Sequence, residues 1–187
     1  DAYPAGRLPV MAPVTWSIGW PSVSLINGQW GASYPFPNLP CSLKKIKPRT
    51  TADAFSARRL NPEWEWNHNP DNTKWSSGGG LILGTATVTN DIYAARNTLT
   101  HRIEGPRSIA TIELDYSAMR DGDVSGLVAL RDSSAWIGVK KAGGVTKVVM
   151  TNALELDANW NTSSFGEEIA SKNISGGKIW LGVDADV

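Results

Sequence analysis

Hydrophobic and polar residues alternate with a period of two along much of the chain after residue 105. In the run ATIELDYSAM, Thr111 and Glu113 alternate with Ala110, Ile112 and Leu114. A strand sends successive side chains to opposite faces, so this alternation predicts a β-strand with one buried face. Further runs of the same kind are GLVALR, AWIGVKK, TKVVMT and KIWLGVDADV.

Turn signals separate these runs and no long helix interrupts them. Dipeptides that favour tight turns occur at Asp121-Gly122, Asp132-Ser133, Gly143-Gly144 and Gly176-Gly177. The best helix candidate, TADAFSARRL, is short. Several short strands at intervals of roughly 8–12 residues predict an all-β fold, an antiparallel β-sandwich.

The first forty residues have a different pattern. Two short apolar runs are joined by Asn27-Gly28, a typical hairpin turn, and a proline-rich stretch follows. Residues 1–40 are therefore predicted to be the last hairpin of another all-β unit. Residues 41–52 lack an apolar period and are predicted to be a linker, which leaves residues 53–187 for the sandwich. Because the chain starts and stops inside β patterns, we expect a fragment of a longer polypeptide.

Composition excludes some classes of function. The 18 basic and 18 acidic residues give a formal charge of zero without long runs of like charge, so no nucleic-acid partner is expected. No apolar stretch approaches a membrane span, and the single Cys41 cannot form an internal disulfide. Nine tryptophans are typical of β-rich carbohydrate-active proteins, although a tryptophan-rich β core explains them equally well.

The segment LNPEWEWNHNP concentrates the candidate chemistry. On a regular strand Trp64, Trp66 and His68 would share one face. Two tryptophans at this spacing could form a platform for sugar rings, or they could fill a sandwich core, which we favour. The same two interpretations apply to Trp75 and Trp136.

The other face of this segment would carry Glu63, Glu65 and Asn67. Two carboxylates on one strand would approach a sugar ring from the same side, whereas an inverting hydrolase needs them on opposite sides. We therefore expect these glutamates to be solvated, or to pair with Arg96 or Arg102 on a neighbouring strand.

Two places in the sequence contain residue types that bind metals. His68 has no second histidine or cysteine at ligand spacing, so we expect a hydrogen-bonding residue at a strand end and no zinc. Asp121 and Asp123 in RDGDVSG offer oxygen ligands that suit calcium. The same letters also spell an ordinary turn, which we favour. No cofactor is expected to be required.

Longer motifs resemble a known family. PVMAPVTW, NGQWG and YPFPNLP resemble the closing segment of the five-bladed β-propeller of glycoside hydrolase family 43. LNPEWEWNHNPDNTKW, ARNTLTHRIEGP, IELDYSAMRDGDVSGL and WIGVKK resemble the concanavalin A-like β-sandwich that follows it in β-xylosidase and α-L-arabinofuranosidase members. The motifs span most of residues 7–150 in the family's order, and only KIWLGVDAD continues the match further on.

The resemblance implies an inverting hydrolase of xylan- or arabinan-type chains, with a general acid, a general base and a third carboxylate. In the family these groups lie in earlier propeller blades, and this sequence has no counterpart for them. Asp1 is the only acidic residue within residues 1–40. We therefore expect no catalytic residue and no hydrolysis by the chain as given.

Three functions follow as hypotheses. The first is the C-terminal part of a secreted, extracellular hemicellulose-degrading glycoside hydrolase, whose sandwich supports the missing part of the catalytic propeller. The second is a stand-alone carbohydrate-binding module for xylan- or arabinan-type polysaccharides. The third is a structural domain without a ligand. No membrane partner is expected for any of them.

A sugar contact would use five residues: Trp66, Asn67, His68, Arg96 and Arg102. The aromatic ring offers a flat apolar face, while amide, imidazole and guanidinium groups hydrogen-bond hydroxyls. Arg96 and Arg102 are six positions apart, so they would face one way on a regular strand. The competing interpretation is that the arginines neutralise Glu63 and Glu65 within the fold.

Overall fold

The computed structural model describes residues 11–38, 40 and 52–186. These residues form strands, turns and loops without any helix, which confirms the predicted all-β class. The described part therefore contains no helix that could cross a bilayer. The chain divides into two compact units, Asp1–Ala52 and Asp53–Val187. The predicted domain limits stay predictions, and residues 41–51 of the predicted linker lie outside the described residues.

The first unit contains an antiparallel hairpin of β1 (Val14–Ser17) and β2 (Trp20–Val23). The two turn residues, Ile18 and Gly19, have φ angles of 54° and 74°. Two consecutive positive φ values give a turn whose twist matches that of the flanking strands. The chain therefore reverses at Ile18-Gly19.

The predicted turn at Asn27-Gly28 exists but does not join the two apolar runs. Its φ angles are 52° and 76°, and it closes a single bridge between Ile26 and Gln29. The prediction that this dipeptide connects the strands of the hairpin is wrong, because Gly19 already permits the reversal earlier in the chain.

The second unit is built on a four-stranded antiparallel sheet in the order β11-β10-β9-β8. Its strands are β8 (Val124–Ala129), β9 (Ser133–Ala142), β10 (Val145–Leu156) and β11 (Thr162–Asn173). The predicted runs GLVALR, AWIGVKK and TKVVMT overlap β8, β9 and β10 respectively.

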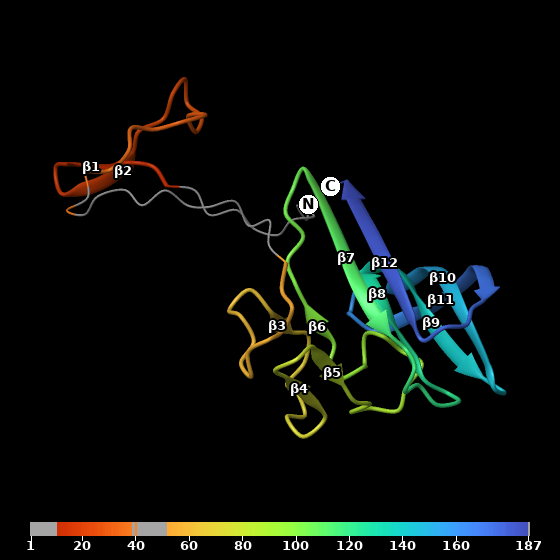
Figure 1. The fold of residues 1–187 in the computed structure, drawn as a ribbon. Helices are drawn as coiled ribbons and strands as arrows, with labels where there is room; N and C mark the ends of the chain where they lie inside the picture. Colours follow the sequence, from red (N-terminus) through yellow and green to blue (C-terminus); the bar gives the residue numbers. More distant parts are fainter. Residues whose placement is uncertain (1–10, 39, 41–51, 187) are drawn as a thin grey trace. The chain divides into compact units, whose positions relative to one another are not determined.

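A second layer of strands completes this unit. The long strands β7 (Arg107–Asp115) and β12 (Lys178–Asp186) pair along their whole length, as Figure 1 shows. Strand β12 also contacts β8 and β9 of the four-stranded sheet. Two short pairs lie earlier in the chain: β3 (Glu65–Trp66) with β6 (Leu99–Thr100), and β4 (Trp75–Ser77) with β5 (Leu81–Leu83).

The two faces of the four-stranded sheet differ in composition. One face, called the Val139 face, carries the apolar side chains of Leu127, Ile137, Val139, Val148 and Met150. Val139 is fully buried, as is Leu181 of β12, so the core includes both layers. The opposite face, called the Trp136 face, carries Gly126, Trp136, Gly138, Lys140, Lys147 and Val149.

A glycine lets the ring of Trp136 approach the sheet. A Cβ atom on Gly138 would lie 2.7 Å from the Trp136 ring and 2.3 Å from the carbonyl oxygen of Ser125. Both distances are too short for a real side chain. The ring therefore lies over backbone, and Trp136 is half-buried as a packing residue of this face.

Strand β11 is absent from the sequence prediction. Thr162–Asn173 is mostly polar, and its last seven residues are all exposed, so its pattern shows little of the apolar alternation that marks the other strands. It forms because its backbone pairs with β10, with irregularities at Met150/Thr151 and Glu155/Leu156. An edge strand needs this pairing more than it needs apolar side chains.

Candidate functional site

Segments 66–71 and 93–100 are joined by backbone and amide hydrogen bonds, and we call this region the seam. The Asn67 amide donates to the carbonyl oxygen of Thr98 at 3.0 Å. The Asp71 amide donates to Asn97 Oδ1 at 2.8 Å, and Asn97 Nδ2 donates back to the Asp71 carbonyl at 3.0 Å. Asn97 is buried and has a φ of 63°, a conformation that asparagine tolerates.

Four of the five predicted sugar-contacting residues lie at this seam, where two of them bind backbone. His68 Nε2 lies 2.6 Å from the carbonyl oxygen of Tyr93. Arg96 donates from Nε to the Asn69 carbonyl at 2.7 Å and from Nη2 to the Pro70 carbonyl at 3.3 Å. His68 is therefore a hydrogen-bonding residue, as predicted, and Arg96 holds the turn that follows it.

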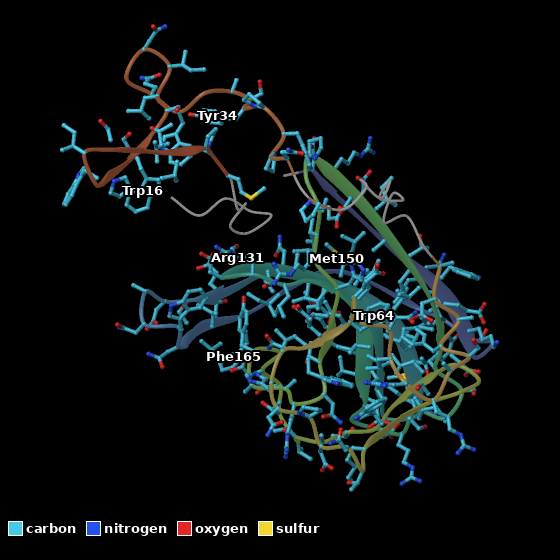
Figure 2. The ribbon with its side chains drawn as sticks, turned by 90° about the vertical axis from the view of Figure 1, so that its left-hand side faces the viewer. Trp16, Tyr34, Trp64, Arg131, Met150 and Phe165 are labelled. Atoms are coloured by element: carbon cyan, nitrogen blue, oxygen red, sulfur yellow. The ribbon has the colours of Figure 1, made fainter. Side chains whose placement is uncertain are left out.

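The tryptophans of this segment pack against other aromatic rings. Trp66 is half-buried, and its ring centre lies 5.2 Å from that of Trp75. Trp64, labelled in Figure 2, donates from Nε1 to Asp53 at 2.8 Å and lies 5.1 Å from the ring of Phe55. Both indoles face their neighbours in the fold, which supports the packing interpretation over an open sugar platform.

The two glutamates have separate partners. Arg102 Nη2 lies 3.7 Å from Glu65 Oε1, and His101 Nε2 lies 3.8 Å from Glu63 Oε2. The predicted pairing of the glutamates with arginines holds for Arg102 alone. The prediction that Arg96 and Arg102 share one face of a regular strand is wrong, because β6 contains only Leu99–Thr100.

The loop with Asp121 and Asp123 behaves as a turn. Both carboxylate oxygens of Asp121 accept from the Gly144 amide at 3.1 Å, and Asp123 Oδ2 accepts from the Arg120 amide at 2.7 Å. Within residues 11–38, 40 and 52–186 there is no group of three or more His, Cys, Asp or Glu residues placed to hold a metal ion. The favoured interpretation of this loop is a turn, and the alternative of calcium binding is not tested by these contacts.

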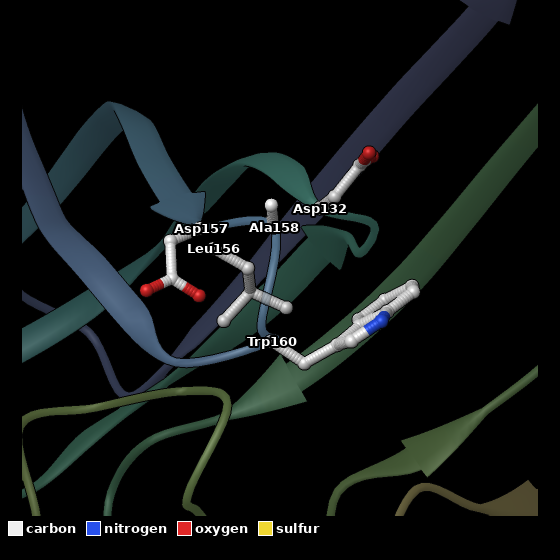
Figure 3. A pocket seen from close by; sticks show the side chains of 5 residues that line it. All are labelled: Asp132, Leu156, Asp157, Ala158 and Trp160. Atoms are coloured by element: carbon white, nitrogen blue, oxygen red, sulfur yellow. The ribbon is translucent and has the colours of Figure 1, made fainter.

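A second candidate site lies at the connection between β10 and β11. A hollow of about 220 Å³ is lined by Asp132, Leu156, Asp157, Ala158 and Trp160. Figure 3 shows these five side chains. The indole of Trp160 projects beside it and is 69 % exposed. Here an open aromatic face stands next to carboxylates, which accept hydrogen bonds from sugar hydroxyls.

The turn that displays Trp160 is held in a strained conformation. Trp160 has a φ of 64°, which is rare for a bulky residue and costs free energy. Asp157 Oδ1 accepts from the backbone amides of Asn159 at 2.8 Å and Asn161 at 2.9 Å. The Asn161 and Asn159 hydrogen bonds hold the pKa of the Asp157 carboxyl below its ordinary value. The turn therefore stabilises an exposed tryptophan where glycine or asparagine would fit without strain.

Tyr93 connects the seam to this hollow. Its carbonyl oxygen receives the contact from His68, and its hydroxyl lies 3.0 Å from both Ser134 Oγ and the Leu154 carbonyl. Burial is the main cause that raises the pKa of the Tyr93 hydroxyl. Next to Tyr93, Asp91 accepts a hydrogen bond from Thr162 of β11 at 2.6 Å.

The apolar alternation of the sequence does not single out Trp160, because this residue lies outside the alternating runs. Trp160 lies in DANWNT, between two strands and among turn-forming residues. Connecting segments mostly lie on the protein surface, so a tryptophan within a turn is expected to be exposed. The position of Trp160 among turn-forming residues was therefore the sequence signal for its exposure.

A family model for the β-xylosidase C-terminal concanavalin A-like domain of glycoside hydrolase family 43 matches residues 52–187. Among curated proteins, a β-xylosidase of Formosa agariphila is 32 % identical over 149 residues, which cover 66 % of this chain and 25 % of that protein. This chain therefore spans about a quarter of that relative's length.

Solved structures show the same fold. One is a family 43 glycoside hydrolase engineered to display both endo-xylanase and exo-arabinofuranosidase activity. It is 45 % identical to this chain with a TM-score of 0.88. The match covers 100 % of this chain and 37 % of that hydrolase. A bifunctional family 43 protein of Bacteroides eggerthii is 30 % identical with a TM-score of 0.76, covering 97 % and 23 % respectively. The predicted β-sandwich is confirmed.

Proposed function

Because this chain belongs to the family of C-terminal concanavalin A-like domains of glycoside hydrolase family 43, we propose that it acts as the C-terminal part of a secreted hemicellulose-degrading hydrolase. Its sandwich supports the catalytic propeller, and the substrates are xylan- or arabinan-type chains. Secretion is part of the proposal because such polymers lie outside cells. The observation that carries it is the family match over residues 52–187.

The relatives support this proposal over a stand-alone binding module. The chain covers 25 % of a protein named as a β-xylosidase and 37 % of a hydrolase with xylanase and arabinofuranosidase activity. Described residues 11–38 and 40 carry no aspartate or glutamate, so they offer no general acid or base. The catalytic carboxylates would come from other parts of the polypeptide.

Hydrolysis of aryl xylosides and aryl arabinofuranosides tests the proposal. The 187-residue chain alone should show no turnover, whereas a polypeptide that also contains the complete propeller should hydrolyse at least one of the two. Turnover by the chain alone, or none by the longer polypeptide, would contradict it.

We further propose that the sandwich contacts the substrate through Trp160 and the hollow beside it. Supporting this, the Trp160 indole is 69 % exposed, whereas Trp66 is half-buried against Trp75. A sugar contact by the seam residues stays a prediction. The contacts of His68 and Arg96 with backbone carbonyls favour a structural role for both.

A further inference from the structure

The Trp136 face carries a second hollow, separate from the one beside Trp160. Its volume is about 530 Å³, and it is lined by residues of β9, β10 and β11. Val149, only 2 % exposed, forms part of its floor, and Val145 adds an apolar surface that is 44 % exposed. The exposed amide of Asn173 lies at the β11 side. An apolar floor edged by polar groups suits a sugar ring.

Two ammonium groups and one carboxylate line this hollow. Lys140 and Lys147 occupy directly opposite positions of β9 and β10, where like charges repel. Lys140 Nζ lies 3.1 Å from Glu168 Oε2 and 5.5 Å from the centre of the Trp136 ring. Lys140 is thus held by an anion and by an aromatic face.

Lys147 is the unbalanced charge. Across the part of the chain that the structure describes, no carboxylate lies within 4.0 Å of its ammonium group. Glu168 is already engaged: its hydrogen bond with Lys140 is the largest cause that lowers the pKa of its carboxyl, and the charge of Lys147 adds to the effect. The hollow therefore carries a net positive charge that one more carboxylate would balance.

We propose that this hollow binds an oligosaccharide that carries a carboxylate group, with that group against the Lys147 ammonium. The inference rests on the proposed function, because a uronate-substituted hemicellulose chain is the ligand class that combines both features. Its sugar rings lie over Val145 and Val149, and its hydroxyls hydrogen-bond the Asn173 amide and the Glu168 carboxylate. The carboxylate–ammonium contact is charge-assisted and supplies the selectivity.

Calorimetric titration of the whole 187-residue chain tests this assignment with three ligands. These are xylotetraose bearing one glucuronate, unsubstituted xylotetraose, and free glucuronate. We expect the acidic oligosaccharide to bind roughly tenfold more tightly than the neutral one, and free glucuronate to bind far more weakly. Equal affinities for the acidic and neutral oligosaccharides would overturn the role of Lys147. Equal affinities for glucuronate and the acidic oligosaccharide would overturn the role of the sugar rings.

Two matched variants locate the charge. Lys147→Met removes the ammonium from the hollow, while Lys172→Met removes an ammonium from the opposite face of the same sheet, where Lys172 pairs with Val148. Lys147→Met should reduce the affinity for the acidic ligand to that for the neutral one, and Lys172→Met should leave it unchanged. Equal losses in both variants would show that only overall charge matters and would overturn the site.

Salt provides a readout that needs no variant. Raising sodium chloride toward 1 M shortens the screening length to about 3 Å, so the preference of the wild-type chain for the acidic ligand should fall. A preference that persists at high salt would also overturn the assignment. These affinity ratios are independent of hydrolysis, so a failure of the proposed function would be seen separately in the turnover assay.

Discussion

His68 Nε2 lies 2.6 Å from the carbonyl oxygen of Tyr93, a residue 25 positions further along the chain. A carbonyl oxygen can only accept a hydrogen bond, so His68 Nε2 is the donor in this contact and carries the proton. The hydrogen bond joins the loop after β3 to the loop before β6, and these two strands have only two residues each. It therefore gives His68 a structural reason for its position.

His68→Ala should lower the free energy of unfolding by about 1 kcal/mol, because the exposed contact to Tyr93 is lost without burying an unpaired group. The affinity for xylo-oligosaccharides should not change. Urea denaturation and calorimetry measure the two quantities. A variant with unchanged stability and weaker sugar binding would instead support the seam as a sugar site.

Trp66→Ala and Arg102→Ala should differ in their effects on stability. Trp66 is half-buried against Trp75, so its removal should cost about 3 kcal/mol. Arg102 is exposed and its nitrogen lies 3.7 Å from Glu65, so its removal should cost about 0–1 kcal/mol. Chemical denaturation of both variants provides the comparison. Similar losses in the two variants would contradict the packing assigned to Trp66.

Tyr93→Phe should destabilise the second unit by about 1–2 kcal/mol, because the hydroxyl bonds Ser134 and Leu154 of the sheet in a partly buried place. Tyr116→Phe is the matched control, since the Tyr116 hydroxyl makes no hydrogen bond among the described residues. Thermal unfolding should separate the two variants. If Tyr116→Phe loses as much stability as Tyr93→Phe, the hydrogen bonds of the Tyr93 hydroxyl are not the cause of the loss.

Acid should destabilise the fold through carboxylates that bind backbone or cationic partners. The Phe55 amide and the Trp64 indole hold the pKa of the Asp53 carboxyl below its ordinary value. Its folded pKa is lower than its unfolded one, so its contribution is present above the unfolded value of about 3.9 and is lost as pH falls through the folded value.

Asp53→Asn should remove this part of the pH dependence. The melting temperature of wild type should fall between neutral pH and pH of about 3, and the fall should be smaller in the variant. Asp186→Asn is the control, because the exposed Asp186 carboxyl makes no hydrogen bond or ion pair among the described residues. If the two variants follow the same pH profile, the Asp53 contacts do not contribute.

The sequence predicted the fold class because alternation is strong where a strand buries one face, as at Ile112 and Leu114 of β7. It did not predict β11, whose mostly polar residues depend on pairing with β10. It placed Arg96 on a regular strand, but the backbone turns at Asn97, whose φ of 63° no apolar pattern can reveal.

The candidate site was harder to predict because sugar contact needs exposure. The sequence favours a strand for Trp66 and says nothing of the ring of Trp75 that covers it. Trp160 is a candidate for sugar contact because the structure places its indole on a turn beside Asp132 and Asp157. The burial of Trp66 and the exposure of Trp160 both depend on tertiary contacts, which the local sequence pattern does not contain.

Binding of neutral xylo-oligosaccharide to wild type, Trp160→Ala and Trp180→Ala, followed by calorimetry, tests the assigned sugar contact most directly. The two tryptophans are equally open, 69 % and 68 % exposed, but only Trp160 lies beside the hollow with Asp132 and Asp157. Trp160→Ala should weaken binding roughly tenfold with little change in melting temperature, because a stacked ring contributes about 1 kcal/mol or more. Trp180→Ala should bind as wild type does. Unchanged affinity in Trp160→Ala, or an equal loss in both variants, would contradict the account.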